Sequence, residues 1–255
     1  MIGNIAIFNK ISKEEAKKIL ERFPYIKTIC IKKGPIKGKL RKPEIAVVVS
    51  RVRKKKTETI HREHNILYKL DVKKVMFSKG NINERHRIAK IARKEETVLD
   101  MFAGIGYFTL PLAKKVKAVY AVELNKEAYN YLIENIKLNK LKNVKAFLGD
   151  CKEVVPKLKT RFDRIVMGLL PSSLPYFKTA LKVSKNKTAL HVSLLVRKKS
   201  IKEEIKRVMA NLKKEAMEEN FDVKLLRAVK VKSYSPAFFH FVLDIEIKKL
   251  KPKTS

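Results

Sequence analysis

The chain has 255 residues, 45% of them hydrophobic, which is enough for the core of one large domain, or of one ordinary domain and a small one. Sixty Lys and Arg against 25 Asp and Glu give a net charge of +35, a surplus that predicts a nucleic acid as partner. No apolar run is long enough to span a bilayer, which excludes a membrane-spanning protein. The two Cys lie far apart in the sequence and are too few for a disulfide framework. Because no signal peptide is recognisable either, the sequence predicts a cytoplasmic protein.

Residues 1–75 are predicted to form a small α+β unit. Ser12 and Glu15 have the spacing of a capping box, and the helix that they open should end before Pro24. Runs rich in β-branched and aromatic residues follow this helix and are typical of strands. These predicted strands cover residues 25–32, 44–50, 57–63 and 65–71.

Two stretches of the small unit are basic and contain no acidic residue: KKGPIKGKLRKP (32–43) and RVRKKK (51–56). Basic loops between short strands suit contacts with phosphates, although either loop taken alone could be a solvated loop without a partner. A lysine-rich proteome is another explanation of the charge, but it would normally add glutamates as well. We therefore expect contacts with tRNA or another nucleic acid from Lys37, Lys39, Arg41, Lys42, Arg51, Arg53, Lys54, Lys55 and Lys56.

Residues 76–250 show alternating helical and strand patterns. Strands are predicted over 97–102, 117–124, 144–150, 162–169 and 188–196, helices over 81–94, 106–116, 125–140, 151–158, 174–184 and 200–219, and a last pair of strands over 221–234 and 238–250. This order predicts an α/β fold: a Rossmann-like domain with a doubly wound, mostly parallel sheet and a terminal antiparallel strand. Residues 251–255 are expected to be a flexible tail.

Polar residues stand at the ends of three successive strands of this domain. The ligand of an open α/β sheet lies across the carboxyl ends of the strands, and a glycine turn before a helix offers it backbone N–H groups. The residues concerned are Asp100, the turn glycines Gly104 and Gly106, Glu123, and the pair Asp150 and Cys151.

These strand ends predict an adenosine ligand. Glu123 can accept hydrogen bonds from both ribose hydroxyls, and Asp150 can accept one from the adenine amino group. The structural alternative is that Asp100 and Asp150 only cap helices. NAD is a weaker candidate ligand, because the third glycine of the dinucleotide fingerprint is absent.

The order of these motifs resembles the Rossmann-like S-adenosylmethionine-dependent transferases. Two upstream motifs, F-S-x-G-N-x-x-E-R at 77–85 and T-E-T-I-H-R-E-H at 57–64, are similar to the archaeal and eukaryotic group of enzymes that modify the purine next to the anticodon of tRNA. That group has two branches. One is a guanine N1-methyltransferase, and the other is the wybutosine-pathway aminocarboxypropyltransferase.

Three departures from the methyltransferase pattern favour the second branch. The methyltransferase usually has F-S-P-R, G-V-G-P-F and N-L-P, whereas this chain has F-S-K-G at 77–80, G-I-G-Y-F at 104–108 and G-L-L-P at 168–171. The resemblance implies transfer of the 3-amino-3-carboxypropyl group of S-adenosylmethionine to a 4-demethylwyosine-type base at purine 37 of tRNA, with release of methylthioadenosine. N1-methylation of guanine at the same position and a non-catalytic basic RNA-binding protein are the alternatives.

The resemblance also implies roles for individual residues. Ser78 and Arg85 would bind the methionine arm, with Arg87 as a competing candidate, while Glu123 would bind the ribose. Asp150 and Cys151 would bind the adenine, and the larger base would occupy a pocket formed by Tyr107, Gly168, Pro171 and Ser172.

Nothing in the sequence identifies a general base or a metal site. His61 and His64 are three residues apart on a predicted strand and so should point to opposite faces. No further Cys or His pair is near them in sequence, so we predict no metal. A monomer is favoured over an oligomer.

Overall fold

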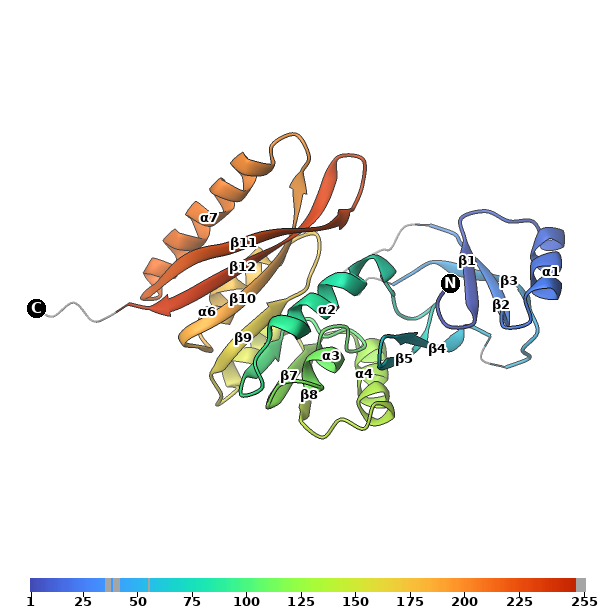
Figure 1. Cartoon of the computed structure of the whole chain (residues 1–255), viewed down its shortest axis with the longest axis horizontal. Coiled ribbons are helices and arrows are strands. Elements are labelled where there is room, and N and C mark those ends of the chain that lie inside the picture. The colour runs from blue at the N-terminus through green and yellow to red at the C-terminus, as the bar shows by residue number, and fades with distance from the viewer. Residues whose placement is uncertain (35–37, 39–41, 55, 251–255) are drawn as a thin grey trace, which may run out of the picture.

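The structure is a computed structural model that describes residues 1–34, 38, 42–54 and 56–250. The molecule is elongated, with a small N-terminal unit at one end and the last strands of a large sheet at the other (Figure 1). The predicted tail 251–255 and four of the predicted nucleic-acid contacts, Lys37, Lys39, Arg41 and Lys55, lie outside the described residues.

The N-terminal unit is a three-stranded sheet covered by one helix. Its elements are β1 (Ile5–Phe8), α1 (Lys13–Arg22), β2 (Thr28–Lys32) and β3 (Ile45–Ser50). β2 is the middle strand, parallel to β1 and antiparallel to β3. Ala16 and Leu20 of α1 pack on Ala6 and Ile29 of this sheet. The sequence analysis missed β1.

The predicted capping box at the start of α1 is confirmed. Ser12 Oγ accepts a hydrogen bond from Glu15 N at 3.1 Å, and Glu15 Oε2 accepts one from Ser12 N at 2.8 Å. We expect Ser12→Ala to lower the free energy of unfolding by about 1 kcal/mol, measured by urea denaturation. Ser200 before α7 (Ile201–Glu218) is the matched control, because its side chain caps no backbone N–H and its Oγ donates to Glu204 Oε1 at 3.3 Å. An equal loss in Ser200→Ala would contradict the capping contribution.

A two-stranded hairpin, β4 (Glu58–Glu63) and β5 (Ile66–Asp71), connects the two parts of the molecule. On one side, Gly3 N donates to His61 Nδ1 at 3.0 Å. On the other side, Asn135 Oδ1 accepts from Lys69 N at 2.6 Å, and Asn135 Nδ2 donates to Lys69 O at 3.0 Å. The amide of Asn135 therefore satisfies the edge of β5 as a neighbouring strand would. The division of the chain at residue 75 remains a prediction.

The large sheet confirms the predicted doubly wound, mostly parallel α/β fold. Its strands are β6 (Thr97–Asp100), β7 (Ala118–Glu123), β8 (Val144–Leu148), β9 (Phe162–Met167), β10 (Ser184–Arg197), β11 (Phe221–Ser233) and β12 (Phe238–Lys249). They lie in the order β11-β12-β10-β9-β6-β7-β8. β12 runs antiparallel to β10 and β11, and the other neighbouring strands are parallel to each other. The order reverses between β6 and β9, where such sheets bind their ligands.

Helices cover both faces of this sheet (Figure 1). They are α2 (Ile82–Ile91), α3 (Thr109–Ala113), α4 (Lys126–Leu138), α5 (Cys151–Val154), α6 (Phe177–Leu181) and α7, with short 3-10 turns at 79–81, 155–157 and 174–176. Ile88 of α2 packs with Val98 of β6 on one face. Phe177 of α6 and Leu212 of α7 pack with Leu99 on the other. In the part of the chain that the structure describes, no helix is long and apolar enough to cross a membrane.

Candidate active site

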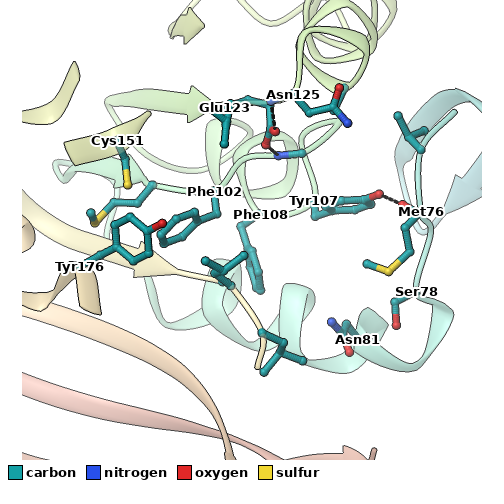
Figure 2. A pocket seen from close by; sticks show the side chains of 18 of the residues that line it. Met76, Ser78, Asn81, Phe102, Tyr107, Phe108, Glu123, Asn125, Cys151 and Tyr176 are labelled. Atoms are coloured by element: carbon teal, nitrogen blue, oxygen red, sulfur yellow. Dashed lines mark hydrogen bonds between the residues drawn. The ribbon is translucent and has the colours of Figure 1, made fainter. Parts of the chain in front are cut away.

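A cavity lies at the carboxyl ends of β6, β7, β8 and β9, across the point where the strand order reverses. Figure 2 shows Cys151 and Tyr176 at one end, Ser78 and Asn81 at the other, and Glu123 between them. Most of the predicted site residues line it: Ser78, Arg85, Gly104, Tyr107, Glu123, Asp150, Cys151 and Gly168. Asp100, Gly106, Pro171 and Ser172 are not part of the lining.

Glu123 is held at the end of β7 by two backbone donors. Its Oε2 accepts from Gly104 N and its Oε1 from Asn125 N, both at 2.7 Å, while burial raises the pKa of the carboxyl. Gly104 has φ +58°, and a Cβ there would lie 2.4 Å from the ring of Tyr107, so only glycine fits. Each carboxylate oxygen keeps a second lone pair that a ligand hydroxyl could use.

Asp100 lies behind the glycine turn and is fully buried. Its Oδ2 accepts from Thr109 Oγ1 at 2.8 Å and its Oδ1 from Phe102 N at 3.3 Å, so the carboxyl ties both ends of the turn together. Burial raises the pKa of Asp100 to about 7. Gly106, with φ +102°, lies against Leu110 in the same turn. Both residues shape the cavity from behind, so any contribution to ligand binding would be indirect.

Arg85 and Ser78 form the end of the cavity nearest the hairpin. Arg85 Nε and Nη2 donate to the Glu63 carboxylate, at 3.1 and 2.6 Å, and Nη1 donates to Ser78 O at 3.0 Å. The guanidinium also lies over the rings of Phe77 and Tyr107, 5.3 and 5.7 Å from their centroids. Arg85, which the resemblance assigned to the methionine arm, therefore already makes a double hydrogen bond with the Glu63 carboxylate.

The competing arginine points elsewhere. Arg87 donates to Glu84, and to Asp244 of β12 at 2.7 and 2.9 Å, and does not line the cavity. Ser78 precedes a 3-10 turn but makes no side-chain cap bond, and its Oγ accepts from Lys232 Nζ at 2.6 Å. Capping alone therefore does not explain Ser78.

Asp150 and Cys151 lie at the opposite end of the cavity. Asp150 Oδ1 accepts from Lys152 N at 3.0 Å, so the predicted capping alternative does describe one of its contacts. Cys151 is buried, lines the cavity and is not in a disulfide. Asp150 therefore caps α5 and also lines the cavity.

The loop after β9 has a different effect from the one expected. Gly168 lines the cavity. A Cβ at this position would lie 2.8 Å from the Phe108 ring, so the absence of a side chain allows that ring to approach the loop closely. Ser172 Oγ accepts from Leu174 N at 3.2 Å, and its backbone bridges to Leu194. Pro171 and Ser172 thus lie away from the cavity wall, because the loop turns back toward β10.

Sequence reasoning missed part of the lining. Phe102 and Phe108 flank the glycine turn, Tyr176 follows the β9 loop, and Asn81 belongs to the F-S-x-G-N motif. Phe102, Phe108 and Asn81 lie in or within two residues of a predicted motif or site residue, and Tyr176 lies five residues after Pro171, so proximity in sequence could have identified them. Phe102 and Tyr176 meet edge to face at 4.9 Å between centroids and form an apolar wall.

A second cavity adjoins the first between the N-terminal sheet and the end of β11. It is bordered by the basic residues Lys32, Lys79 and Lys232 and by Tyr234, which is 46% exposed. Both cavities are lined by Val75, Met76, Ser78, Asn81 and Leu170, so they share one wall. The predicted nucleic-acid contacts that the structure describes are all exposed: Lys42, Arg51, Arg53, Lys54 and Lys56.

The histidines of HREH make protein contacts. His61 Nδ1 accepts from Gly3 N, and the ring of His64 lies 4.7 Å from that of His86. Among the residues that the structure describes, no three His, Cys, Asp or Glu are grouped so that they could hold a metal ion.

Comparison with known proteins identifies close relatives. The sequence model described as the TRM5/TYW2 methyltransferase domain matches residues 59–225. The tRNA(Phe) (4-demethylwyosine(37)-C(7)) aminocarboxypropyltransferase of Methanocaldococcus jannaschii is 39% identical over 98% of this chain and 97% of that protein. The crystal structure of M. jannaschii TYW2 in complex with AdoMet has a TM-score of 0.77 at 32% identity and covers 98% of both chains.

A solved structure from the other branch is similar in shape. Trm5b from Pyrococcus abyssi has a TM-score of 0.83 at 33% identity, and the match covers 97% of this chain and 74% of that one. The fold is therefore common to both branches, and the site must distinguish them.

Proposed function

The chain belongs to the TRM5/TYW2 methyltransferase domain family, and from this premise we propose that it transfers the 3-amino-3-carboxypropyl group of S-adenosylmethionine to C7 of a 4-demethylwyosine-type base at position 37 of tRNA. The resemblance inferred from the sequence motifs is thereby confirmed at the level of the family. The choice of the aminocarboxypropyltransferase branch over the N1-methyltransferase branch rests on the loop Gly168-Leu169-Leu170. This loop presents no side-chain amide to the cavity.

The cavity fits S-adenosylmethionine along its length. Glu123, fixed by two backbone N–H groups, would accept from the ribose hydroxyls near the middle. Asp150 and Cys151 would hold the adenine at one end, and Ser78 and Arg85 the amino acid arm at the other. Figure 2 shows these two ends on opposite sides of Glu123, which is the order of the groups in the ligand.

The reaction that we propose requires positioning more than acid–base chemistry. C7 of the base attacks the γ-carbon of the arm, the bond from that carbon to sulfur breaks, and methylthioadenosine leaves with the bonding electrons. The hydrogen on C7 is then lost as a proton to solvent, which restores the aromatic base. Because the sulfonium is already a good leaving group, the protein must mainly align the γ-carbon, rather than the methyl carbon, with the base. The apolar side chains of Phe102, Phe108 and Tyr176 would exclude water from the space between the γ-carbon and the base.

The second cavity supports tRNA as the partner. It opens beside the proposed arm end of the first cavity and carries Lys32, Lys79 and Lys232, which can contact phosphates, and Tyr234, which can stack on a base. The cytoplasmic setting and the monomeric state remain predictions.

Two forms of labelled S-adenosylmethionine test the proposal. The protein is incubated with tRNA that carries 4-demethylwyosine at position 37, using label in the methyl group or in the carboxyl carbon. We expect label in the tRNA only from the carboxyl carbon. The same tRNA with guanine at position 37 is the control and should accept neither label.

Methyl label in the guanine tRNA would overturn the proposal in favour of N1-methylation. Absence of both labels from both tRNAs, with tRNA binding retained, would support a non-catalytic RNA-binding protein.

A further inference from the structure

A β-bulge in β11 turns the side chain of Lys232 toward the face of the sheet that α2 covers. Lys230 is paired with Phe241 of β12, but two residues later the partner is His240. Val231 is therefore the extra residue of the bulge. Paired residues of two strands point to the same face of a sheet, and successive residues of one strand alternate between the faces. The bulge thus places Lys230 and Lys232 on opposite faces, whereas residues two positions apart in a regular strand share a face.

The contacts of the two lysines agree with this register. On one face, Lys230 Nζ lies 4.5 Å from the ring centroid of Phe239. On the other face, Lys232 Nζ donates to Ser78 Oγ at 2.6 Å, just before α2. Arg85 Nη1 holds the main-chain oxygen of the same serine at 3.0 Å. A lysine from the end of β11 and an arginine from α2 therefore fix Ser78 from two sides.

Gly80 leaves the space through which Lys232 reaches Ser78. A Cβ at position 80 would lie 2.9 Å from Cδ and 3.4 Å from Nζ of Lys232. Because non-bonded carbon atoms pack at about 3.5–4.0 Å, a side chain at this position would displace the aliphatic part of the lysine. The glycine that ends the F-S-K-G stretch thus has a physical reason in the contact between Lys232 and Ser78.

The contact with Lys232 restricts how the Ser78 hydroxyl can bond. Ser78 is half-buried and lines both cavities. A serine hydroxyl can donate one hydrogen bond and accept two, whereas an ammonium group can only donate. Ser78 Oγ must therefore accept from Lys232, and its own proton remains for another acceptor. A charged donor also polarises the hydroxyl and strengthens the bond that it donates.

We propose that Lys232 is a positioning residue that directs the hydroxyl proton of Ser78 to the carboxylate of the amino acid arm of S-adenosylmethionine. This inference rests on the proposed function, in which Ser78 holds that arm. The C-terminal hairpin of β11 and β12 thereby helps to fix the arm without a contact of its own with the ligand. Fixing the carboxylate sets the direction of the γ-carbon relative to sulfur.

A double-mutant cycle measured by calorimetry tests this role. Lys232→Met removes the donor and keeps a long apolar chain, and Ser78→Ala removes the hydroxyl. We expect each single variant to weaken S-adenosylmethionine binding about three- to tenfold, the effect of one hydrogen bond. The double variant should lose no more than Ser78→Ala alone, because Lys232 then has no hydroxyl to direct. Methylthioadenosine, which lacks the arm, should bind all three variants as it binds the wild type.

Two further variants complete the test. Gly80→Ala should weaken S-adenosylmethionine binding as much as Lys232→Met does, because its Cβ displaces the lysine. Lys230→Met is the matched control, since it removes the same charge from the same strand but on the face of Phe239. It should leave the affinity for both ligands unchanged.

Three results would overturn the proposal. Losses that add in the double variant would show that Lys232 acts independently of Ser78. An equal loss of methylthioadenosine affinity in Lys232→Met would indicate a structural role. Unchanged affinities combined with a raised KM for tRNA would assign Lys232 to a phosphate instead.

The cycle and the labelling experiment can fail separately. If the enzyme transferred the methyl group, label would come from the methyl carbon, yet the losses would still not add, because both reactions use the same co-substrate. Additive losses together with carboxyl label in the tRNA would overturn only the role of Lys232.

Discussion

Glu123→Ala is expected to lower the affinity for S-adenosylmethionine by at least about a hundredfold, the largest effect on binding that we predict. Two ribose hydroxyls would lose a charged acceptor, and each such hydrogen bond contributes about 1.5–3 kcal/mol. The change also removes the acceptor of Gly104 N and Asn125 N, which the carboxylate holds at 2.7 Å. Calorimetric titration with S-adenosylmethionine measures the loss.

Glu127→Ala is the control for this variant. Glu127 lies four residues later, is exposed, and pairs with Lys74 on the surface, so its removal should leave the affinity unchanged. Retained affinity in Glu123→Ala would contradict the assignment of the ribose.

The affinity should also depend on pH in a direction that the structure fixes. Burial raises the pKa of Glu123 above its ordinary value of 4.5, so protonation begins at a higher pH than for an exposed glutamate. The ionised form is the one that accepts from both hydroxyls, so affinity is full above the raised pKa of Glu123 and falls as the pH is lowered through it. In Glu123→Gln this part of the pH dependence should disappear.

The sequence predicted the large sheet well because its signals are local. Buried strands followed by amphipathic helices repeat along the chain, and the acid at the end of β7 follows directly from that pattern. β1 was missed because it is only four residues long and pairs with β2 across an intervening helix. The helix expected from Gly106 begins only at Thr109, because a residue at φ +102° cannot be helical.

Contacts between distant segments explain what the sequence could not predict of the site. The pairing of Arg85 with Glu63 joins residues 22 positions apart on different elements, and no periodicity encodes it. Gly168 could be recognised as unusual, but its approach to Phe108 depends on how the β6 and β9 loops meet.

A buried ionic network fixes α2 on the sheet and so supports the arm end of the cavity. Arg87 donates to Asp244 of β12, and the Asp244 carboxylate lies 2.6 Å from His191 Nδ1. His191 Nε2 lies 2.6 Å from Arg164 Nη1, and Arg164 pairs with Glu96 at 2.7 Å. The network thus connects α2 with three adjacent strands, β12, β10 and β9.

The charges of this network follow from its hydrogen bonds. Burial lowers the pKa of His191, so the ring is neutral and can donate to Asp244 while it accepts from Arg164. Burial alone would raise the pKa of Asp244, but the hydrogen bonds from His191 and Arg87 hold it at about 2. Both pKa values lie below their ordinary ones of 6.5 and 3.8, so both groups stabilise the fold at neutral pH.

Asp244→Ala should therefore lower the free energy of unfolding by about 3–5 kcal/mol, because Arg87 and His191 lose a buried partner. Glu218→Ala is the matched control, since Glu218 pairs with Lys178 at the same 2.7 Å but on the surface, where a pair contributes about 0–1 kcal/mol. Urea denaturation at neutral pH measures both losses. Equal losses of unfolding free energy in the two variants would show that the buried ion pair contributes no more to stability than the exposed one.

The pH dependence separates the network from simple packing. In the wild type, stability should fall as the pH drops below about 6.5, where an unfolded histidine gains a proton, and again below about 4, where an unfolded aspartate does. Asp244→Ala removes the part of the second decrease that Asp244 contributes, while carboxyls such as Glu63, whose pKa is also lowered, keep theirs. Because α2 carries both Arg87 and Arg85, a loosened network should also disturb the cavity, so Asp244→Ala is expected to weaken S-adenosylmethionine binding more than Glu218→Ala does.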